Sequence, residues 1–147
     1  MVDDICTVTM VRIGVVGYGH LGQYLVENIA KHPDLELAWV WNRSDLKGKM
    51  EQKYILKDLA DCASGNPDVI VEVAHPDITK QFGAKFLATA DFMIGSPTAL
   101  ADVDLETSLA TAASTHGLYI PSGALWGGED IRKMSERGTL KGLTGIL

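Results

Sequence analysis

Three glycines near the start of the sequence have the spacing G-x-G-x-x-G, in the stretch V-V-G-Y-G-H-L-G-Q at residues 15–23. Gly17 would permit a tight turn, and Gly19 has no side chain to keep a pyrophosphate away from the backbone. Gly22 would let a following helix pack closely against the preceding strand. The N-terminus of that helix would offer unpaired N–H groups and the positive end of its dipole to the phosphates. The stretch predicts a dinucleotide-binding loop, and a glycine-rich turn that only closes a strand–helix unit is the alternative.

The end of the second apolar run, Leu35–Trp41, bears on which dinucleotide would bind. Folds that bind NAD usually carry Asp or Glu about 20 residues beyond the glycines, where the carboxylate accepts a hydrogen bond from the ribose 2′-hydroxyl. Here that position is Asn42, and Arg43 follows it. Asn42 has no charge to repel a 2′-phosphate, and Arg43 could pair with one. We therefore expect NADP to be favoured or tolerated. In the alternative, Asn42 binds the ribose of NAD and Arg43 is a solvated turn residue.

The elements that must position these residues follow from the alternation of apolar runs and helical periods along the chain. Short apolar runs bounded by turn residues predict buried strands, and apolar residues at helical spacing predict helices. The predicted strands are 11–16, 35–41, 69–73, 91–94 and 118–121. The predicted helices are 21–31, 57–63, 76–89, 103–115 and 127–137. This order implies parallel strands joined by right-handed crossovers, and so an α/β protein with a doubly wound parallel sheet.

Several side chains have structural interpretations at this stage. Glu72 stands inside the apolar run V-I-V-E-V, so its burial would need a partner, and we expect a structural hydrogen bond rather than catalysis. The tryptophans are expected to be core or domain-interface aromatics: Trp39, Trp41 and Trp126. The helix predicted over 103–115 is expected to turn four residues toward the core: Val103, Leu105, Leu109 and Ala113.

Composition and charge exclude several classes of protein. The chain has 147 residues, enough for one domain with its own core, and a formal net charge of −6. That balance argues against nucleic-acid and anionic-membrane partners, which need clustered Lys and Arg. No apolar stretch approaches the roughly 18–20 residues that span a bilayer, and the first residues do not resemble a signal peptide, so we expect a cytoplasmic protein. Cys6 and Cys62 do not form a C-x-x-C pair and the histidines lack ligand spacing, so we expect reduced thiols and no metal.

The sequence resembles the aspartate dehydrogenase family, especially its animal members, in four places. These are V-G-Y-G-H-L-G-Q (16–23), V-W-N-R (40–43), V-E-V-A-H-P (71–76), and the pair G-S-P-T-A-L-A-D (95–102) and P-S-G-A-L-W-G-G-E-D-I (121–131). The resemblance implies a Rossmann fold over residues 1–138 that binds NADP or NAD. Residues 139–147 would then be the stub of the first strand of a C-terminal α+β domain, before which the chain is truncated.

The resemblance also implies which residues contact the cofactor. Those expected at the pyrophosphate are Gly17, Gly19, His20, Leu21 and Gly22, and those at the adenosine ribose are Asn42 and Arg43. Those expected after the third and fourth strands are Ala74, His75, Pro76, Gly95 and Ser96. Those expected near the nicotinamide, after the fifth strand, are Ser122, Gly123 and Ala124. Two of these have a second interpretation, because His20 could face solvent and His75 could simply cap the next helix.

Members of that family oxidatively deaminate L-aspartate to iminoaspartate, which hydrolyses to oxaloacetate and ammonia. Their catalytic histidine and aspartate-binding residues belong to the C-terminal domain, and no residue of this sequence matches them. The resemblance therefore implies a cofactor-binding half that handles aspartate only with that domain, shows little or no turnover alone, and belongs to a homodimer. One alternative is a catalytically silent NAD(P)-binding module or truncated isoform. Another is a different two-domain Rossmann dehydrogenase, such as the homoserine type.

Overall fold

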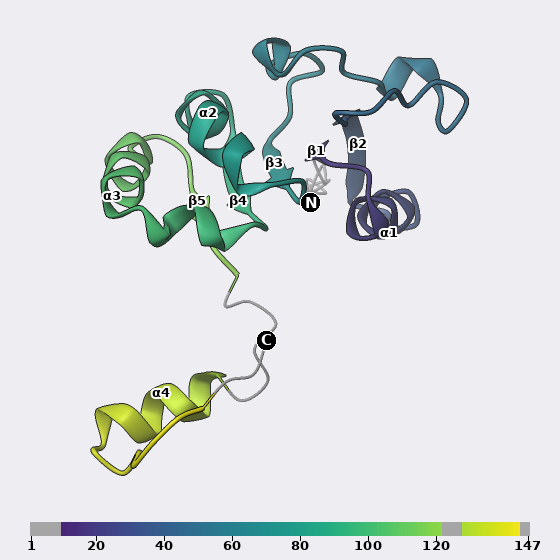
Figure 1. Ribbon diagram of the computed structural model, residues 1–147. Coiled ribbons are helices and arrows are strands. Elements are labelled where there is room, and N and C mark those ends of the chain that lie inside the picture. The colour runs from purple at the N-terminus through teal and green to yellow at the C-terminus, as the bar shows by residue number, and fades with distance from the viewer. Residues whose placement is uncertain (1–9, 122–127, 145–147) are drawn as a thin grey trace, which may run out of the picture.

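A computed structural model describes residues 10–121 and 128–144, and its centre is a five-stranded, all-parallel sheet (Figure 1). The strands are β1 (Val11–Val16), β2 (Leu35–Trp41), β3 (Val69–Glu72), β4 (Asp91–Ile94) and β5 (Leu118–Tyr119). The helices are α1 (His20–Ile29), α2 (Pro76–Leu87), α3 (Val103–Ala112) and α4 (Gly128–Glu136). Three 3₁₀ turns are η1 (Gln52–Tyr54), η2 (Leu59–Asp61) and η3 (Pro97–Ala101). The predicted doubly wound parallel α/β fold is confirmed.

The two faces of the sheet carry different helices, because neighbouring residues of a strand point to opposite sides. Val16, Ile70 and Phe92 face a core closed by α2 and α3. Val15 and Val40 face a second core closed by α1. The strand order is β2-β1-β3-β4-β5, so the chain runs outward from β1 to β2 and then returns past β1 to β3. In such sheets ligands bind at the carboxyl ends of the strands where the order reverses, here between β1 and β3.

Aromatic side chains fill the centre of the larger core. Phe86 of α2 and Phe92 of β4 are fully buried, and their ring centroids lie 5.2 Å apart in an edge-to-face arrangement. Trp39 of β2 is also buried, and its Nε1–H donates to the carbonyl of Cys62 at 3.1 Å. Gly14 of β1 makes room for this indole, because a Cβ there would lie 2.5 Å from Trp39 Cζ2. The expectation that Trp39 belongs to the core is confirmed.

The helix predicted over 57–63 is wrong, and only the short 3₁₀ turn η2 forms there. Before that turn, the Leu56 N–H donates to the carbonyl of Val40 at 2.9 Å, which holds the chain extended along the outer edge of β2. The Asp58 side chain then accepts from the Ala60 N–H at 2.8 Å and starts the turn. Gly65, with a φ of +71°, and the following Asn66 redirect the chain soon afterwards, so no room is left for a longer helix.

The position of Val103 corrects a second expectation, because its side chain is 68% exposed rather than in the core. Leu109 is buried, and Leu105 and Ala113 pack against the same core, as predicted. Two residues along an α-helix correspond to a rotation of about 200°, so Val103 faces away from Leu105. Asp102 fixes this first turn by accepting hydrogen bonds from the backbone N–H groups of residues 104 and 105, both at 3.2 Å.

The last described segment contains α4, which has no buried residue. Its first turn carries Glu129 and Asp130, as expected, and Gly138, with a φ of +66°, follows the end of the helix. Residues 140–144, where the sequence suggested the beginning of a strand, are not in a strand. Trp126 and residues 122–124 lie outside the described residues.

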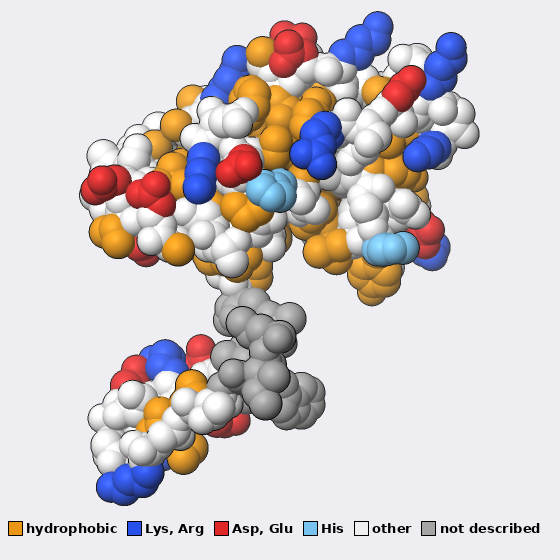
Figure 2. Space-filling view, viewed as in Figure 1, with side chains coloured by type: hydrophobic (Ala, Val, Ile, Leu, Met, Phe, Trp, Pro, Cys, Tyr) orange, Lys and Arg blue, Asp and Glu red, His pale blue; other side chains and the backbone are white. Residues whose placement is uncertain are grey.

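The charged side chains on the surface are mixed in sign. Figure 2 shows Lys and Arg side chains spread over the visible face with Asp and Glu side chains between them. No described helix is long and apolar enough to cross a bilayer.

Candidate functional site

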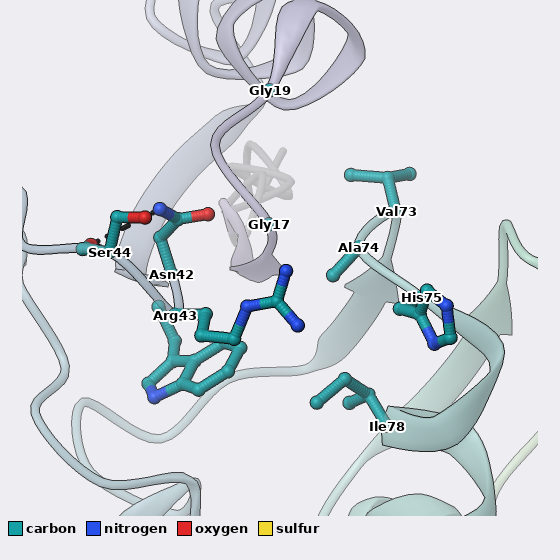
Figure 3. Close-up of a pocket in the computed structure, with 10 residues that line it drawn as sticks. Gly17, Gly19, Asn42, Arg43, Ser44, Val73, Ala74, His75 and Ile78 are labelled. Carbon is teal, nitrogen blue, oxygen red and sulfur yellow. Dashed lines mark hydrogen bonds between the residues drawn. The ribbon is translucent and has the colours of Figure 1, made fainter.

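A pocket opens at the carboxyl edge of the sheet, beside the loops that follow the paired strands β1 and β3 (Figure 3). Three segments that are distant in sequence form its wall: the glycine loop after β1, the turn after β2, and the turn between β3 and α2. Its lining residues are Gly17, Gly19, Trp41, Asn42, Arg43, Ser44, Val73, Ala74, His75 and Ile78. Six of the lining residues were expected to contact a cofactor, and the sequence analysis did not assign the other four to the site.

The three glycines have three different surroundings. Gly17 has a φ of +108°, and a Cβ there would lie 2.9 Å from the carbonyl oxygen of Val73. Gly22 lies against the same loop, because a Cβ there would lie 2.0 Å from the carbonyl oxygen of Gly17. Gly19 is open, with nothing within 4 Å of a Cβ, and it precedes α1 without capping it through a side chain. The loop is therefore tightly packed at Gly17 and Gly22. At Gly19, just before α1, the surface is open.

The first two residues of α1, His20 and Leu21, are placed differently from the loop glycines. Both are exposed, Leu21 by 54%, and neither lines the pocket. Exposure at the start of α1 fits either interpretation of His20, so its contact with a pyrophosphate stays a prediction.

Asn42 braces the glycine loop against the turn after β2. Its Oδ1 accepts the backbone N–H of Tyr18 at 3.0 Å, and its Nδ2 donates to the carbonyl of Ser44 at 3.1 Å. The carbonyl of Trp41 accepts the N–H of Gly17 at 2.7 Å, which adds a second tie between the two segments. The Asn42 side chain is therefore part of the wall, held by bonds to the protein itself.

Arg43 is the cationic side chain of the pocket. It is exposed, and its guanidinium extends from the end of β2 toward the turn between β3 and α2 (Figure 3). In the described part of the chain no carboxylate forms an ion pair with it. An exposed guanidinium without a carboxylate partner can bind a phosphate group through two parallel hydrogen bonds, as a bidentate pair.

Apolar side chains complete the pocket, and these were missed from the sequence. Trp41 is half-buried and lines the pocket opposite Val73 and Ile78, so it is more than a core aromatic. Such a lining suits a flat apolar group like a nucleobase. Trp41 and Ser44 could have been predicted as lining residues, because they flank the predicted pair at 42–43 in the sequence.

His75 caps the next helix, as one of its two interpretations expected, and its place in the pocket wall leaves contact with a cofactor as a prediction. It caps α2, since its Nδ1 accepts the N–H of Asp77 at 3.2 Å, and it also lines the pocket. Because an accepting nitrogen carries no proton, the neutral ring holds its proton on Nε2. The Asp77 carboxylate lies 3.3 Å from the same Nδ1, a contact that becomes an ion pair only when the ring is protonated. Pro76 is the first residue of the helix, as predicted, and lies outside the pocket lining.

Glu72, at the end of β3, is fully buried and accepts five hydrogen bonds. Its Oε1 accepts the backbone N–H groups of Ala74 at 2.7 Å and His75 at 2.8 Å. The Ser96 hydroxyl donates to Oε1 and the Ser96 N–H to Oε2, both at 3.1 Å. The Thr79 hydroxyl donates to Oε2 at 3.4 Å. The expectation of structural hydrogen bonds for this residue is confirmed.

Gly95 and Ser96 follow β4 and lie beside the pocket without lining it. Gly95 donates its N–H to the carbonyl of Glu72 at 2.7 Å, and a Cβ there would lie 2.4 Å from that oxygen. The turn after β4 is thus packed directly onto the end of β3. The residues expected near the nicotinamide, Ser122, Gly123 and Ala124, lie outside the described residues.

Groups with displaced pKa values lie away from the pocket. Hydrogen bonding to Glu51 raises the pKa of Lys53, and hydrogen bonding to Arg132 lowers the pKa of Glu129 in α4. Among residues 10–121 and 128–144, no group of three His, Cys, Asp or Glu side chains could hold a metal ion. The site is therefore best described as a binding pocket with a glycine loop, one cation and an apolar wall.

Comparison with known proteins agrees with this description. Residues 17–121 match the family described as homoserine dehydrogenase, NAD binding domain. The matched range begins at the first glycine of the loop and includes every residue that lines the pocket.

Two of the sequence relatives have names that refer to aspartate dehydrogenase. The chain is 55% identical to an aspartate dehydrogenase domain-containing protein of Xenopus tropicalis, over 90% of this chain and 49% of that protein. It is 28% identical to an L-aspartate dehydrogenase of Methanocaldococcus jannaschii, over 85% of this chain and 50% of that enzyme. The chain thus spans about half the length of the curated relatives it matches.

Solved structures share the fold. An aspartate dehydrogenase from Thermotoga maritima aligns with a TM-score of 0.63 at 22% identity, over 86% of this chain and 50% of that chain. An engineered D-amino acid dehydrogenase bound to NADP+ aligns with a TM-score of 0.65 at 25% identity, over 90% of this chain and 42% of that chain. Together with the family match, these likenesses support a nicotinamide dinucleotide as the ligand class.

Proposed function

The chain belongs to the NAD-binding domain family of the homoserine dehydrogenase type, and from this premise we propose that it is the cofactor-binding half of an L-aspartate dehydrogenase. The observation that carries the proposal is the convergence of the glycine loop, Arg43 and the turn after β3 on one pocket. The choice of aspartate rests on the relatives, since the chain is 55% identical to an aspartate dehydrogenase domain-containing protein.

The residues of the glycine loop fit a dinucleotide. The open surroundings of Gly19 leave space for a pyrophosphate at the start of α1, where backbone N–H groups and the helix dipole favour negative charge. Gly17 and Gly22 hold the loop in place through contacts that a side chain would break. This arrangement supplies the geometry that the G-x-G-x-x-G spacing requires.

NADP is the dinucleotide that we propose. Arg43 has no carboxylate partner among the described residues and lies beside Ser44 in the pocket wall, so the two can hold a 2′-phosphate. Asn42 already uses its oxygen for the Tyr18 N–H, which makes it a poor substitute for the carboxylate that binds the ribose of NAD.

The proposed reaction is the oxidative deamination of L-aspartate, for which the bound dinucleotide supplies the hydride acceptor. Oxidation breaks the Cα–H bond of aspartate, and the hydrogen leaves with its electron pair as a hydride. Loss of a proton from the amine gives iminoaspartate, and water then yields oxaloacetate and ammonia. In this scheme the residues of the present chain bind and orient the dinucleotide. The proton acceptor and the aspartate-binding groups are assigned to the other half of the full-length protein.

A second candidate is the cofactor-binding half of a homoserine dehydrogenase, and the family match favours it because the family carries that description. Both candidates require the same pocket. They differ in the substrate that the full-length protein oxidises, which an assay with L-aspartate and L-homoserine distinguishes.

A titration followed by tryptophan fluorescence tests the cofactor part of the proposal. Because Trp41 lines the pocket, NADPH is expected to quench its emission saturably, and NADH is expected to bind more weakly. The Arg43→Ala variant should lose the preference for NADPH. Arg137→Ala, which changes an exposed arginine after α4, is the matched control.

The outcomes separate the parts of the proposal. If the folded wild-type chain binds neither dinucleotide, the pocket is not a cofactor site in this chain. If it binds both with equal affinity, the NADP assignment is wrong while the cofactor site stands. Oxidation of L-aspartate by the full-length protein, and not of L-homoserine, would support the proposed substrate.

A further inference from the structure

Glu72 is the only buried carboxylate among the described residues, and its five hydrogen bonds have a particular arrangement. Two donors, the N–H groups of Ala74 and His75, belong to the turn after β3. Two more, the N–H and hydroxyl of Ser96, belong to the turn after β4. One carboxylate therefore joins two turns that begin on neighbouring strands.

An apolar side chain at position 72 could not accept these hydrogen bonds. It would leave the N–H groups of Ala74, His75 and Ser96 without the acceptor that they have now, and a buried N–H without a partner is costly. Burying a carboxylate is also costly unless its oxygens are hydrogen-bonded, and here both oxygens are. The residue is thus matched to the backbone donors of the two turns.

The turn at residues 74–75 forms one wall of the pocket, whereas Ser96 lies beside the pocket without lining it. Arg43 and the turn after β2 lie on the side of β1 toward β2, and the turn after β3 forms the opposite wall of the pocket. A dinucleotide that binds along the carboxyl ends of the strands extends from there toward β4. Ser96 stands at that end of the path, and Glu72 sets its distance from Ala74 and His75.

We propose that Glu72 is a positioning residue for the nicotinamide half of the dinucleotide, which it acts on through the turns at residues 74–75 and at Ser96. This inference rests on the proposed function. Glu72 itself is fully buried, so it places the groups that meet the ligand and is not expected to contact the ligand.

The Glu72→Gln variant tests this role because it damages one turn more than the other. The amide oxygen can keep accepting the N–H groups of Ala74 and His75, while the amide nitrogen replaces Oε2. The Thr79 hydroxyl can then accept from that nitrogen, but the Ser96 N–H faces a donor instead of an acceptor. The main interaction that this variant loses is therefore the hydrogen bond from the Ser96 N–H.

Two ligands separate positioning from simple loss of structure. NADPH contains both halves of the cofactor, whereas adenosine 2′,5′-bisphosphate contains only the adenosine half. We expect Glu72→Gln to weaken NADPH binding about ten-fold and to leave the affinity for the bisphosphate within about two-fold of the wild type. Equal losses for the two ligands, or an unchanged affinity for NADPH, would overturn the proposal.

Thr79→Val is the matched control, because it removes a bond to the same carboxylate from the helix side. It should lower the melting temperature while keeping the wild-type ratio of the two affinities, and a selective loss of NADPH in this control would count against the proposal. If Glu72→Gln does not fold, Ser96→Ala removes only the 3.1 Å hydroxyl bond and should again weaken NADPH selectively. A wild-type chain that binds neither ligand would refute the proposed function, and the role of Glu72 with it.

Discussion

The open surroundings of Gly19 lead to a prediction in which stability and binding change in opposite directions. In Gly19→Ala, the new methyl group would meet nothing within 4 Å, and the residue already has ordinary extended angles, with a φ of −76° and a ψ of −165°. Replacing glycine by alanine where the backbone allows it stabilises a protein by about 0.4–1 kcal/mol, because the unfolded chain loses freedom. The melting temperature should therefore stay unchanged or rise slightly.

Binding should fall in the same variant, because the methyl group would occupy the surface that a pyrophosphate approaches. Hydrogen bonds to a charged group contribute about 1.5–3 kcal/mol each. Loss of one such bond corresponds to an affinity lower by roughly 10-fold to 100-fold, since about 1.4 kcal/mol is a factor of ten. A fluorescence titration with NADPH measures this change, and thermal unfolding of the same sample measures stability.

Gly22→Ala is the control for Gly19→Ala, because both variants add one methyl group to the same loop. Its methyl group would lie 2.0 Å from the carbonyl oxygen of Gly17, so α1 must move away from the loop. Overpacking of this kind costs about 1–3 kcal/mol, and we expect a clearly lower melting temperature. If Gly19→Ala binds NADPH as the wild type does, the loop only closes a strand–helix unit and the reasoning about the pyrophosphate is refuted.

Three further predictions concern the pocket wall and α4. Arg43→Ala should weaken NADPH binding by roughly ten-fold or more while NADH changes little, and Arg137→Ala should change neither; equal losses for both dinucleotides would contradict a 2′-phosphate contact. Trp41→Phe should abolish most of the quenching by NADPH, and quenching that persists would mean that another tryptophan reports binding. In α4, Arg132 lowers the pKa of Glu129 below its ordinary value of 4.5, so this interaction is present above pH 4.5 and is lost as the pH falls through the lowered pKa. NMR titration of the Glu129 carboxyl should show a midpoint below 4.5 that Arg132→Gln returns toward 4.5, and a midpoint unchanged by that substitution would contradict the interaction.

Local patterns were sufficient to predict the sheet and the glycine loop. The apolar runs that became β1, β2 and β4 begin and end where the sequence analysis placed them, because each is a short run bounded by turn residues. The loop was predictable for the same reason, since its three glycines lie within a few residues of one another. The parallel direction of the strands was predictable because strands and helices alternate along the chain.

Contacts between distant segments were beyond the sequence analysis. Nothing near Asn42 in the sequence indicates that its side chain would accept the Tyr18 N–H, 24 residues away. Likewise, the sequence showed that a buried Glu72 would need a partner, but not that Ser96 would be that partner. The failed helix over 57–63 has the same origin, because the competing interaction is with the outer edge of β2.

The two edges of the sheet have a consequence for how the chain behaves in concentrated solution. An edge strand with free N–H and C=O groups can pair with another chain and begin an aggregate. On one side, the segment at residues 55–56 pairs with Val40 of β2 and interrupts the free edge. On the other side, β5 has only two residues, Leu118 and Tyr119, which is too short to align a partner strand well. The fold thus limits edge-to-edge aggregation by two different means, an added segment at β2 and brevity at β5.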